Sequence, residues 1–338
     1  MIGARALRRW SGAARAFVRR RSRRGLVLLY HRVAGPRFDP MLLDVAPARF
    51  VEHLDVLRAT AAVLPLGEFE SLRRAGRLPP RAVAVTFDDG YADNLLAAAP
   101  RLQAAGVPAT VFVTAGMVGG AGEFWWDDVE RIAFAPRPLG GDAPALAQPW
   151  SAEASASEVD ARWNVFAAPH TARQRLFLTL CGALGGLPSP ERDRHVATLR
   201  EWAGVSATAR DSHRTLSRAE LAMLAAVPGI AVGAHTMTHP RLSAQEPAVQ
   251  RRELQESRET LEGWLGRPVP HVAYPFGTDA DVSAATVRAA RAAGFAAAFV
   301  NMPAPAWRWD DALRVPRLLV RDWDAATFES RLHAWWAA

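Results

Sequence analysis

Two adjacent carboxylates, Asp88 and Asp89, follow an apolar, β-branched run that begins at Val83. Such a run predicts a buried parallel strand that delivers both acids to its carboxyl end. Neighbouring side chains on an extended strand point in different directions, and like charges held close together raise each other's pKa. A bound cation would resolve this conflict, with one carboxylate as its ligand and the other free as a base. The alternative is that one of the acids caps a helix beginning near Tyr91.

Two histidines, His235 and His239, stand four residues apart at the end of a second predicted strand, residues 230–235. If the chain turns helical after this strand, the spacing brings both imidazoles to one side. Two imidazoles and one carboxylate form a ligand set for a divalent metal and leave a coordination position open for water. Two histidines at this spacing are more often unrelated to metal binding. The pair becomes a candidate metal site because an Asp-Asp-Gly strand end accompanies it.

These residues need a scaffold that brings distant strand ends together. Short apolar runs of strand type alternate with segments of helical periodicity along most of the chain. The strand-like runs are residues 26–31, 83–87, 108–113, 230–235, 269–274, 295–300 and 314–320. About seven strands alternating with helices predict a parallel, barrel-like α/β body. In such folds the functional residues gather at the carboxyl ends of the strands.

The alternation of strand and helix is interrupted between about residues 119 and 212. This segment contains a Pro/Gly/Ala-rich stretch (136–168) and two predicted helices, 172–184 and 191–202. The alternation of strands and helices then resumes with runs of the same kind, so we expect an insertion that covers the site rather than a separate domain. Residues 26–338 would then form one barrel that contains the insertion.

The first 25 residues form a basic arm. The 41 basic residues of the chain, all arginine, outnumber its 34 acidic residues, and no acid precedes Asp39. Nine of the arginines lie within residues 1–24. Apolar residues between them recur at spacings near three and four, which predicts an amphipathic helix suited to an anionic membrane surface. A solvated arm is the alternative. Nucleic acid is not expected as a partner, because no sequence motif for nucleic-acid recognition follows the arm.

Other features of the sequence exclude whole classes of protein. No continuous apolar core precedes the arginine run at 19–24, so a secretory signal is not expected. The sequence has no charge-free apolar run long enough to span a membrane. We therefore expect a cytoplasmic protein whose arm contacts the inner face of the membrane. Cys181 is the only cysteine, which excludes an intramolecular disulfide and a thiolate metal cluster.

The two motifs Thr86-Phe-Asp-Asp-Gly90 and His235-Thr-x-x-His239 resemble those of the polysaccharide deacetylases of the NodB-homology group, carbohydrate esterase family four. Members of this family adopt a distorted (β/α) barrel and remove N- or O-acyl groups from sugars with a metal-activated water. The resemblance covers roughly residues 31–320, apart from the insertion, and implies a distorted (β/α)7 barrel.

The same resemblance implies roles for the motif residues. Asp88 would be the general base, and the metal would be held by Asp89, His235 and His239. This ligand set suits Zn²⁺ best among the divalent metals. Tyr274-Pro-Phe-Gly277 resembles a third family motif, which would place the backbone N–H of Phe276 at the developing oxyanion.

Two family residues are missing from their usual places. The arginine that normally precedes the Pro-aromatic pair is replaced by Val272 and Ala273. We predict that Arg317 holds Asp88 instead, with an ordinary ion pair or a rim position as the alternative. No leucine-x-histidine strand lies near the C-terminus to supply the general acid. His31 ends the first strand, as in relatives with permuted motif order, and is our predicted acid; a buried histidine bonded to backbone is the alternative.

Three aromatic residues are candidates for substrate contact. Trp125 and Trp126 follow soon after the third predicted strand, where an aromatic platform would stack against a sugar ring. Core packing is the alternative for both. Tyr91, beside the Asp-Asp-Gly turn, is the third candidate.

The sequence thus predicts a metal-dependent hydrolase that removes N-acetyl groups from amino sugars of a polysaccharide or its precursor. One alternative is a deformylase or deacetylase of a lipid-linked amino sugar, which the basic arm would suit. Another is a catalytically inactive carbohydrate-binding barrel. A binding module has no need of Asp88, Asp89, His235 and His239 together, which argues against the last alternative.

Overall fold

The computed structural model describes residues 24–338, apart from 36–37, 141, 149 and 151–155. The predicted amphipathic arm falls on residues 1–23, outside this description, so its helix and its membrane contact stay predictions. Within the described residues, no helix combines the length and the apolar character needed to cross a bilayer.

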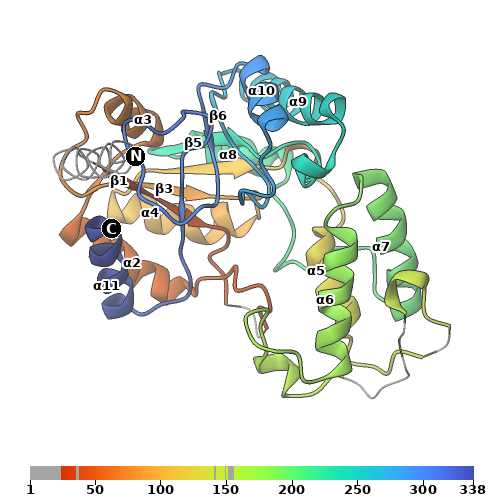
Figure 1. Cartoon of the computed structure of the whole chain (residues 1–338). Coiled ribbons are helices and arrows are strands. Elements are labelled where there is room, and N and C mark those ends of the chain that lie inside the picture. The colour runs from red at the N-terminus through yellow and green to blue at the C-terminus, as the bar shows by residue number, and fades with distance from the viewer. Residues whose placement is uncertain (1–23, 36–37, 141, 149, 151–155) are drawn as a thin grey trace, which may run out of the picture.

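Eight strands form one sheet that curls into a nearly closed parallel barrel (Figure 1). Seven of them follow one another in the order β7-β6-β5-β4-β3-β1-β8, while β2 pairs with β3 off this path. The strands are β1 (Gly25–Tyr30), β2 (Ala62–Val63), β3 (Ala82–Phe87), β4 (Ala109–Val113), β5 (Ile230–Ala234), β6 (His271–Ala273), β7 (Ala297–Phe299) and β8 (Leu318–Leu319). A parallel bridge between Phe299 and Val315 brings β7 beside the segment preceding β8. The predicted barrel is confirmed, with β2 as an additional short strand.

Burial and register explain why the strands carry the chemistry at one end. All six residues of β1 and all six of β3 are buried, as expected for parallel strands covered on both faces. The register pairs Tyr30 with Phe87 and Val113 with Ala234. The residues that follow these strands therefore leave the barrel at its carboxyl end. They include His31, Asp88 and His235.

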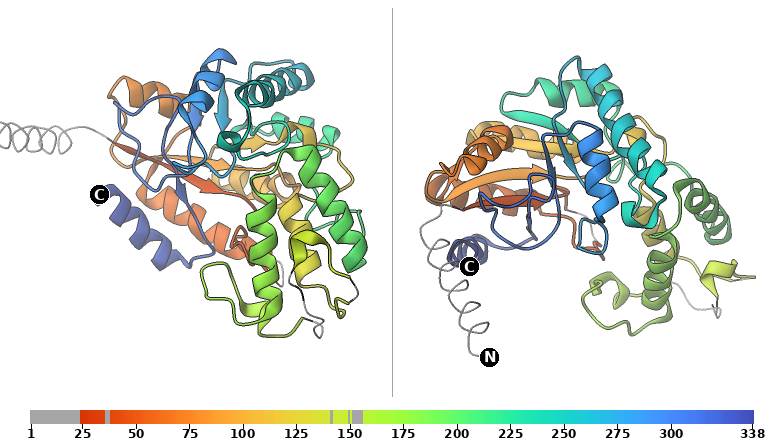
Figure 2. Two further views of the ribbon diagram at one scale, coloured as in Figure 1. Left: turned by 45° about the vertical axis from the view of Figure 1, so that its right-hand side comes forward. Right: turned by 45° about the horizontal axis from the view of Figure 1, so that its top comes forward.

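Helices surround the barrel (Figure 2). They are α2 (Pro47–Thr60), α3 (Leu66–Arg74), α4 (Ala99–Ala105, preceded by the π-helical turn Asn94–Ala98), α8 (Arg218–Ala226), α9 (Pro247–Leu265), α10 (Ala284–Ala292) and α11 (Ala325–Ala337). Ser217 and Glu220 form a capping box at the start of α8. Gly106 and Gly266 end α4 and α9 with φ of 64° and 63°, conformations that favour glycine.

Three helices of the segment 119–212 stand beside the barrel as a lobe (Figure 1). They are α5 (Trp125–Ala133), α6 (Ala172–Leu184) and α7 (Ser189–Ala203). The lobe has its own cluster of buried apolar side chains, distinct from the two clusters of the barrel. The sequence predicts α6 and α7 but not α5, whose first residue follows Phe124, an N-cap without a side-chain hydrogen bond.

Candidate metal centre

The Asp88–Gly90 turn sends the two adjacent carboxylates in different directions. Asp89 has φ of 74° and Gly90 has φ of 85°, so both lie in the left-handed region. Gly90 also packs closely, because a Cβ there would lie 3.1 Å from Cγ1 of Val113. A non-glycine residue in this conformation is strained, and such strain is commonly found at functional sites. The turn thereby separates the carboxylates of Asp88 and Asp89, whose like charges would otherwise raise each other's pKa.

Asp89 faces the two histidines in an arrangement that fits a tetrahedral metal. Its Oδ1 lies 3.5 Å from Nε2 of His235 and 3.4 Å from Nε2 of His239. Ligands at bond lengths near 2.1 Å around a tetrahedral Zn²⁺ lie about 3.4 Å apart. Asp89 Oδ1 is buried and has no hydrogen-bond partner in the described chain. We call Asp89, His235 and His239 the metal triad, because its donor atoms and spacing fit a divalent cation.

The imidazole of His235 has its metal-facing nitrogen left free. Its Nδ1 lies 2.8 Å from the carbonyl oxygen of Ala273 and donates its hydrogen there, which leaves the Nε2 lone pair for a ligand. Burial lowers the pKa of His235, but Asp88 and Asp89 outweigh burial and raise it overall. Burial lowers the pKa of His239 well below its ordinary value, which keeps this imidazole neutral and able to ligate.

The loop that carries His239 is not helical, in contrast to the geometry we considered from the spacing. Thr236 and His239 have φ of 66° and 53°, and the hydroxyl of Thr236 accepts a hydrogen bond of 3.1 Å from the His239 N–H. Left-handed residues cannot continue an α-helix. The loop nevertheless brings the two imidazole centroids within 4.9 Å of each other.

Two residues from distant helices hold this loop. Glu253 of α9 accepts hydrogen bonds from the backbone N–H groups of Met237 (2.8 Å) and Thr238 (2.9 Å), and from the Thr238 hydroxyl (2.7 Å). Arg192 of α7 donates to the carbonyl oxygen of Thr238 at 2.9 Å. Neither residue can be found from sequence, because no local pattern links it to the His-x-x-x-His motif.

Asp88 is held by Arg317, the residue predicted for that position. Two guanidinium nitrogens donate to the two carboxylate oxygens at 2.7 and 2.6 Å, and Arg317 is fully buried. Burial alone would raise the pKa of Asp88, but Arg317 and His235 lower it overall. Asp88 Oδ2 lies 3.9 Å from Nε2 of His235, so an ionised carboxylate stands beside the metal triad.

A cavity of about 510 Å³ opens over these residues. His31 and Phe276 line it together with Asp88 and the metal triad. Burial lowers the pKa of His31 despite the opposing effect of Asp89 and Asp88. Phe276 has φ of 60°, and its backbone N–H donates to no acceptor among the described residues, as an oxyanion donor requires.

Of the three predicted aromatic contacts, two line the cavity and one does not. Trp125 and Trp126 line it, although each is mostly buried. Tyr91 is fully buried under the insertion, where its hydroxyl donates to Asp127 at 2.7 Å and accepts from the indole N–H of Trp126 at 2.9 Å. Tyr91 therefore supports Trp126 and is not among the residues that line the cavity.

Further lining residues come from segments that the sequence analysis did not assign to the site. Phe166, Cys181, Gly182 and Gly185 belong to the insertion, whereas Arg241, Asp281, Asn301 and Arg321 follow barrel elements. Arg241 and Arg321 could have been sought from sequence, since one lies two residues after His239 and the other two residues after β8. The insertion residues carry no such signal.

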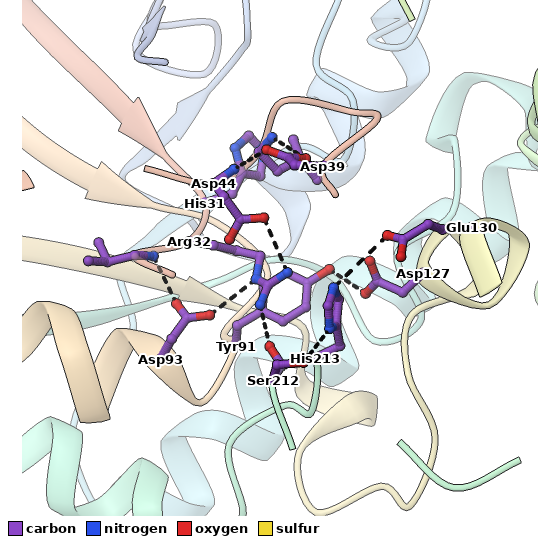
Figure 3. Close-up of polar contacts among 12 residues, drawn as sticks. His31, Arg32, Asp39, Asp44, Tyr91, Asp93, Asp127, Glu130, Ser212 and His213 are labelled. Atoms are coloured by element: carbon purple, nitrogen blue, oxygen red, sulfur yellow. Dashed lines mark hydrogen bonds and ion pairs between the residues drawn. The ribbon is translucent and has the colours of Figure 1, made fainter. Parts of the chain in front are cut away.

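A second histidine–carboxylate group lies where the barrel meets the insertion (Figure 3). Asp127 and Glu130 of α5 and His213 bring donor atoms within 4.8 Å of one another, as in the metal triad. Arg32 and Tyr91 complete this group, which we call the junction cluster. The guanidinium carbon of Arg32 lies 4.7 Å from the centroid of the Tyr91 ring.

The junction cluster already contains its cations. Arg32 pairs with Asp93 at 3.1 Å and donates to the carbonyl oxygen of Ser212, and Arg210 pairs with Glu130 at 2.8 Å. Burial, followed by the charges of Arg32, Arg210 and Arg131, lowers the pKa of His213 to about 2. Because Glu130 is paired with Arg210 and Asp127 accepts a hydrogen bond from the Tyr91 hydroxyl, this cluster fits a structural polar network better than a metal site.

Comparison with known proteins supports the fold and the motifs. The family model described as "Polysaccharide deacetylase" matches residues 75–140 and 200–298. The unmatched residues between these two ranges fall within the predicted insertion. A search of curated proteins finds no match.

Several solved structures resemble the chain along most of its length. The Streptococcus pyogenes deacetylase PplD, in complex with acetate, is 16% identical with a TM-score of 0.59, over 92% of this chain and 99% of that one. IcaB from Ammonifex degensii is 19% identical with a TM-score of 0.56, over 93% and 97% of the two chains. A de-N-acetylase from Aggregatibacter actinomycetemcomitans is 14% identical with a TM-score of 0.56, over 92% and 100%. At these identities the likeness establishes the fold.

Proposed function

The chain belongs to the polysaccharide deacetylase family, and we propose that it is a metal-dependent hydrolase that removes N-acetyl groups from amino sugars of a polysaccharide or its precursor. One observation carries the proposal: Asp89 faces two histidines, while Asp88, beside them, is ionised and held by Arg317. Hydrolysis of an amide needs an electrophilic site with a base next to it. A carbohydrate-binding barrel needs neither.

A divalent cation, best Zn²⁺, on the metal triad would supply a Lewis acid that polarises the acyl carbonyl and makes a water molecule more acidic. Asp88 would accept the proton of the attacking water, and Arg317 keeps Asp88 ionised and oriented for this step. The Phe276 N–H would donate to the carbonyl oxygen as negative charge develops there.

His31 is the proposed donor to the leaving nitrogen. Burial lowers the pKa of His31, so we expect a neutral imidazole before the reaction begins. The proton that it donates would then come from the reacting water and not from a resting imidazolium. Donation to the nitrogen is required, because an amine anion is a poor leaving group.

The proposal is tested by product release from a panel of N-acetylated and N-formylated amino-sugar oligosaccharides. The zinc-loaded protein should release acetate from the N-acetylated members, and Asp88→Asn should not. Formate release in place of acetate would favour the deformylase. If neither product appears from any member while zinc is bound, the hydrolase proposal fails and the binding barrel gains support.

We also propose that the protein is cytoplasmic and that the basic arm, residues 1–25, contacts the inner face of the membrane. The support is the excess of arginine over acid in this segment. Deletion of residues 1–24 should abolish sedimentation with anionic vesicles. Unchanged sedimentation would contradict a role for the arm.

A further inference from the structure

Two arginines, Arg241 and Arg321, line the same cavity as the metal triad. They come from different parts of the barrel, one following the His239 loop and the other following β8. Neither is needed for the hydrolytic step described above. Their positive charges are therefore available to contact another part of a substrate.

Arg241 already has a carboxylate partner. It forms an ion pair of 3.0 Å with the buried Asp281, and its guanidinium carbon lies 4.9 Å from the centroid of the Phe276 ring. The other oxygen of Asp281 accepts hydrogen bonds from the backbone N–H (3.0 Å) and the hydroxyl (2.5 Å) of Thr278. Arg241 is thus fixed beside the proposed oxyanion donor, and its side chain is 39% exposed.

Arg321 lacks such a partner. Its Nη1 donates to the carbonyl oxygens of Met41 (3.0 Å) and Leu42 (2.5 Å), and no carboxylate of the described residues lies within 4.0 Å of it. The recorded hydrogen bonds use Nη1 alone, which leaves Nε and Nη2 as donors. Burial lowers the pKa of Arg321, and the charge of Asp39, which forms no ion pair with Arg321, offsets this effect only in part.

The other charges of the cavity are balanced in pairs. Asp88 is neutralised by Arg317, Asp281 by Arg241, and Asp89 by the cation that the metal triad would hold. What remains is the charge of Arg321 and the second charge of the metal. A partly buried cation without a counter-ion is costly, and an anionic ligand group offsets that cost.

The insertion adds an aromatic surface next to this cation. The ring of Phe166 lies 4.9 Å from the guanidinium carbon of Arg321, and 71% of the Phe166 side chain surface is exposed. An exposed ring at the edge of a cavity suits stacking against a sugar. Phe166 and Arg321 therefore offer a ring contact and an anion contact side by side.

We propose that the substrate carries an anionic group, a carboxylate or a phosphate ester, next to the acylated sugar, and that Arg321 binds this group with Arg241 as a second donor. A planar guanidinium presents paired donors that match both kinds of anion. The proposal rests on the proposed function for the identity of the reaction. It does not rest on that function for binding, which can be measured without turnover.

Binding is measured by calorimetry with the zinc-loaded full chain and four saccharides in two matched pairs. These are a neutral tetramer of N-acetylglucosamine, a tetrasaccharide alternating N-acetylglucosamine with glucuronate, and N-acetylglucosamine 1-phosphate, compared with N-acetylglucosamine itself. At least one anionic ligand should bind about tenfold more tightly than its neutral counterpart, the size expected for one charge-assisted contact. The glucuronate and phosphate arms identify the source of the anion, and the preference should weaken as salt is added.

Substitution of Arg321 separates recognition by the arginine from direct binding of the anion to zinc. Arg321→Gln should remove the preference while leaving the affinity for the neutral ligand unchanged, and Arg321→Lys should restore part of it. Arg218→Gln is the matched control, because Arg218 packs on Trp264 outside the cavity. It should keep the full preference.

The proposal is overturned by equal affinities for neutral and anionic ligands, by a preference that persists in Arg321→Gln, or by a loss of neutral binding in Arg321→Gln that matches the loss of anionic binding. The last result would assign Arg321 a structural role on the Met41–Leu42 turn. Acetate and formate are measured in the same samples. If anionic ligands bind more tightly but no acetate or formate is released, the proposed function alone is contradicted. If acetate or formate is released but neutral and anionic ligands bind equally, the anion site alone is contradicted.

Discussion

The metal triad and the junction cluster contain the same kinds of side chain in different electrostatic surroundings. Each group brings histidine and carboxylate donor atoms within 4.8 Å of one another. In the metal triad, Asp89 Oδ1 has no hydrogen-bond partner in the described chain, and a cavity of about 510 Å³ lies over it. In the junction cluster, Glu130 pairs with Arg210, and the Tyr91 hydroxyl donates to Asp127.

We infer from this difference that residue type and proximity alone do not define a metal site. The feature that separates the two groups is whether their carboxylates already have a cation or a hydrogen-bond donor. Arginines supply the positive charge at the junction cluster and hold the barrel against the insertion. At the metal triad Arg317 pairs with Asp88, and no arginine of the described residues forms an ion pair with Asp89, which leaves Asp89 for another cation. A change in one group should therefore leave the other group intact.

The largest expected effect is on turnover in Asp88→Asn. Loss of a general base lowers kcat by about 100- to 10,000-fold, while zinc content should stay that of the wild type because Asp89 and both histidines remain. Acetate release and metal analysis on the same preparation check this prediction. Turnover near that of the wild type would remove Asp88 from the role of base, and loss of zinc would assign it to the metal instead.

At the junction cluster, Arg32→Met should destabilise the fold and leave zinc binding intact. Removal of one partner from a buried ion pair costs about 3–5 kcal/mol, and Arg32 is 2% exposed between Asp44 and Asp93. Urea unfolding measures the loss. Arg49→Met is the control, because Arg49 pairs with Glu52 at an exposed position and its loss should change the free energy of unfolding much less. Equal costs for the two variants would contradict a structural role for Arg32.

Glu253→Ala should weaken the metal triad without touching a ligand. The loop between His235 and His239 loses three hydrogen bonds in this variant, and residues that orient metal ligands contribute about 10- to 100-fold in metal affinity. Competition with a zinc chelator measures the change. Glu256→Ala removes the same charge from an exposed position on α9 and should bind zinc as the wild type does. Equal affinities in both variants would show that the loop orders itself.

The smallest expected effect is the pH dependence that His213 adds to stability. Burial and three arginines lower the pKa of His213 from 6.5 to about 2. Below pH 6.5 the unfolded chain binds a proton that the folded chain does not, so this group makes the fold less stable as the pH falls toward 2. The slope is at most about 1.4 kcal/mol per pH unit.

His213→Gln should therefore flatten the pH dependence of unfolding on the acid side of neutrality. Urea unfolding at several pH values measures the slope, and the exposed His333→Gln serves as the control. An unchanged slope in His213→Gln would mean that the imidazole takes up its proton freely in the folded chain. The junction cluster would then resemble the metal triad more closely than we infer.

Much of the barrel could be predicted from sequence because its strands are buried on both faces. Such strands read as uninterrupted apolar runs, and β1 and β3 fall within one residue of their predicted starts. The parallel register then requires that His31, Asp88 and His235 meet at one end. The adjacent acids and the spaced histidines at the ends of predicted strands therefore locate this part of the site from sequence alone.

The remaining features depend on contacts between segments far apart in the chain. Glu253 and Arg192 reach the His239 loop from helices that carry no motif, and the left-handed conformation of Thr236 and His239 is set by these contacts. Tyr91 lies outside the cavity although its neighbour in sequence, Gly90, belongs to the site, because its side chain turns under the insertion. Local pattern cannot show which way such a side chain points.

Zinc stoichiometry in matched histidine variants tests the central distinction most directly. Purified wild type, His235→Ala and His213→Ala are loaded with zinc, dialysed and analysed for metal, with thermal unfolding to verify that each is folded. We predict a single zinc ion per chain in the wild type and in His213→Ala, and none in His235→Ala. Zinc that is retained by His235→Ala and lost from His213→Ala would contradict the account and place the metal at the junction cluster.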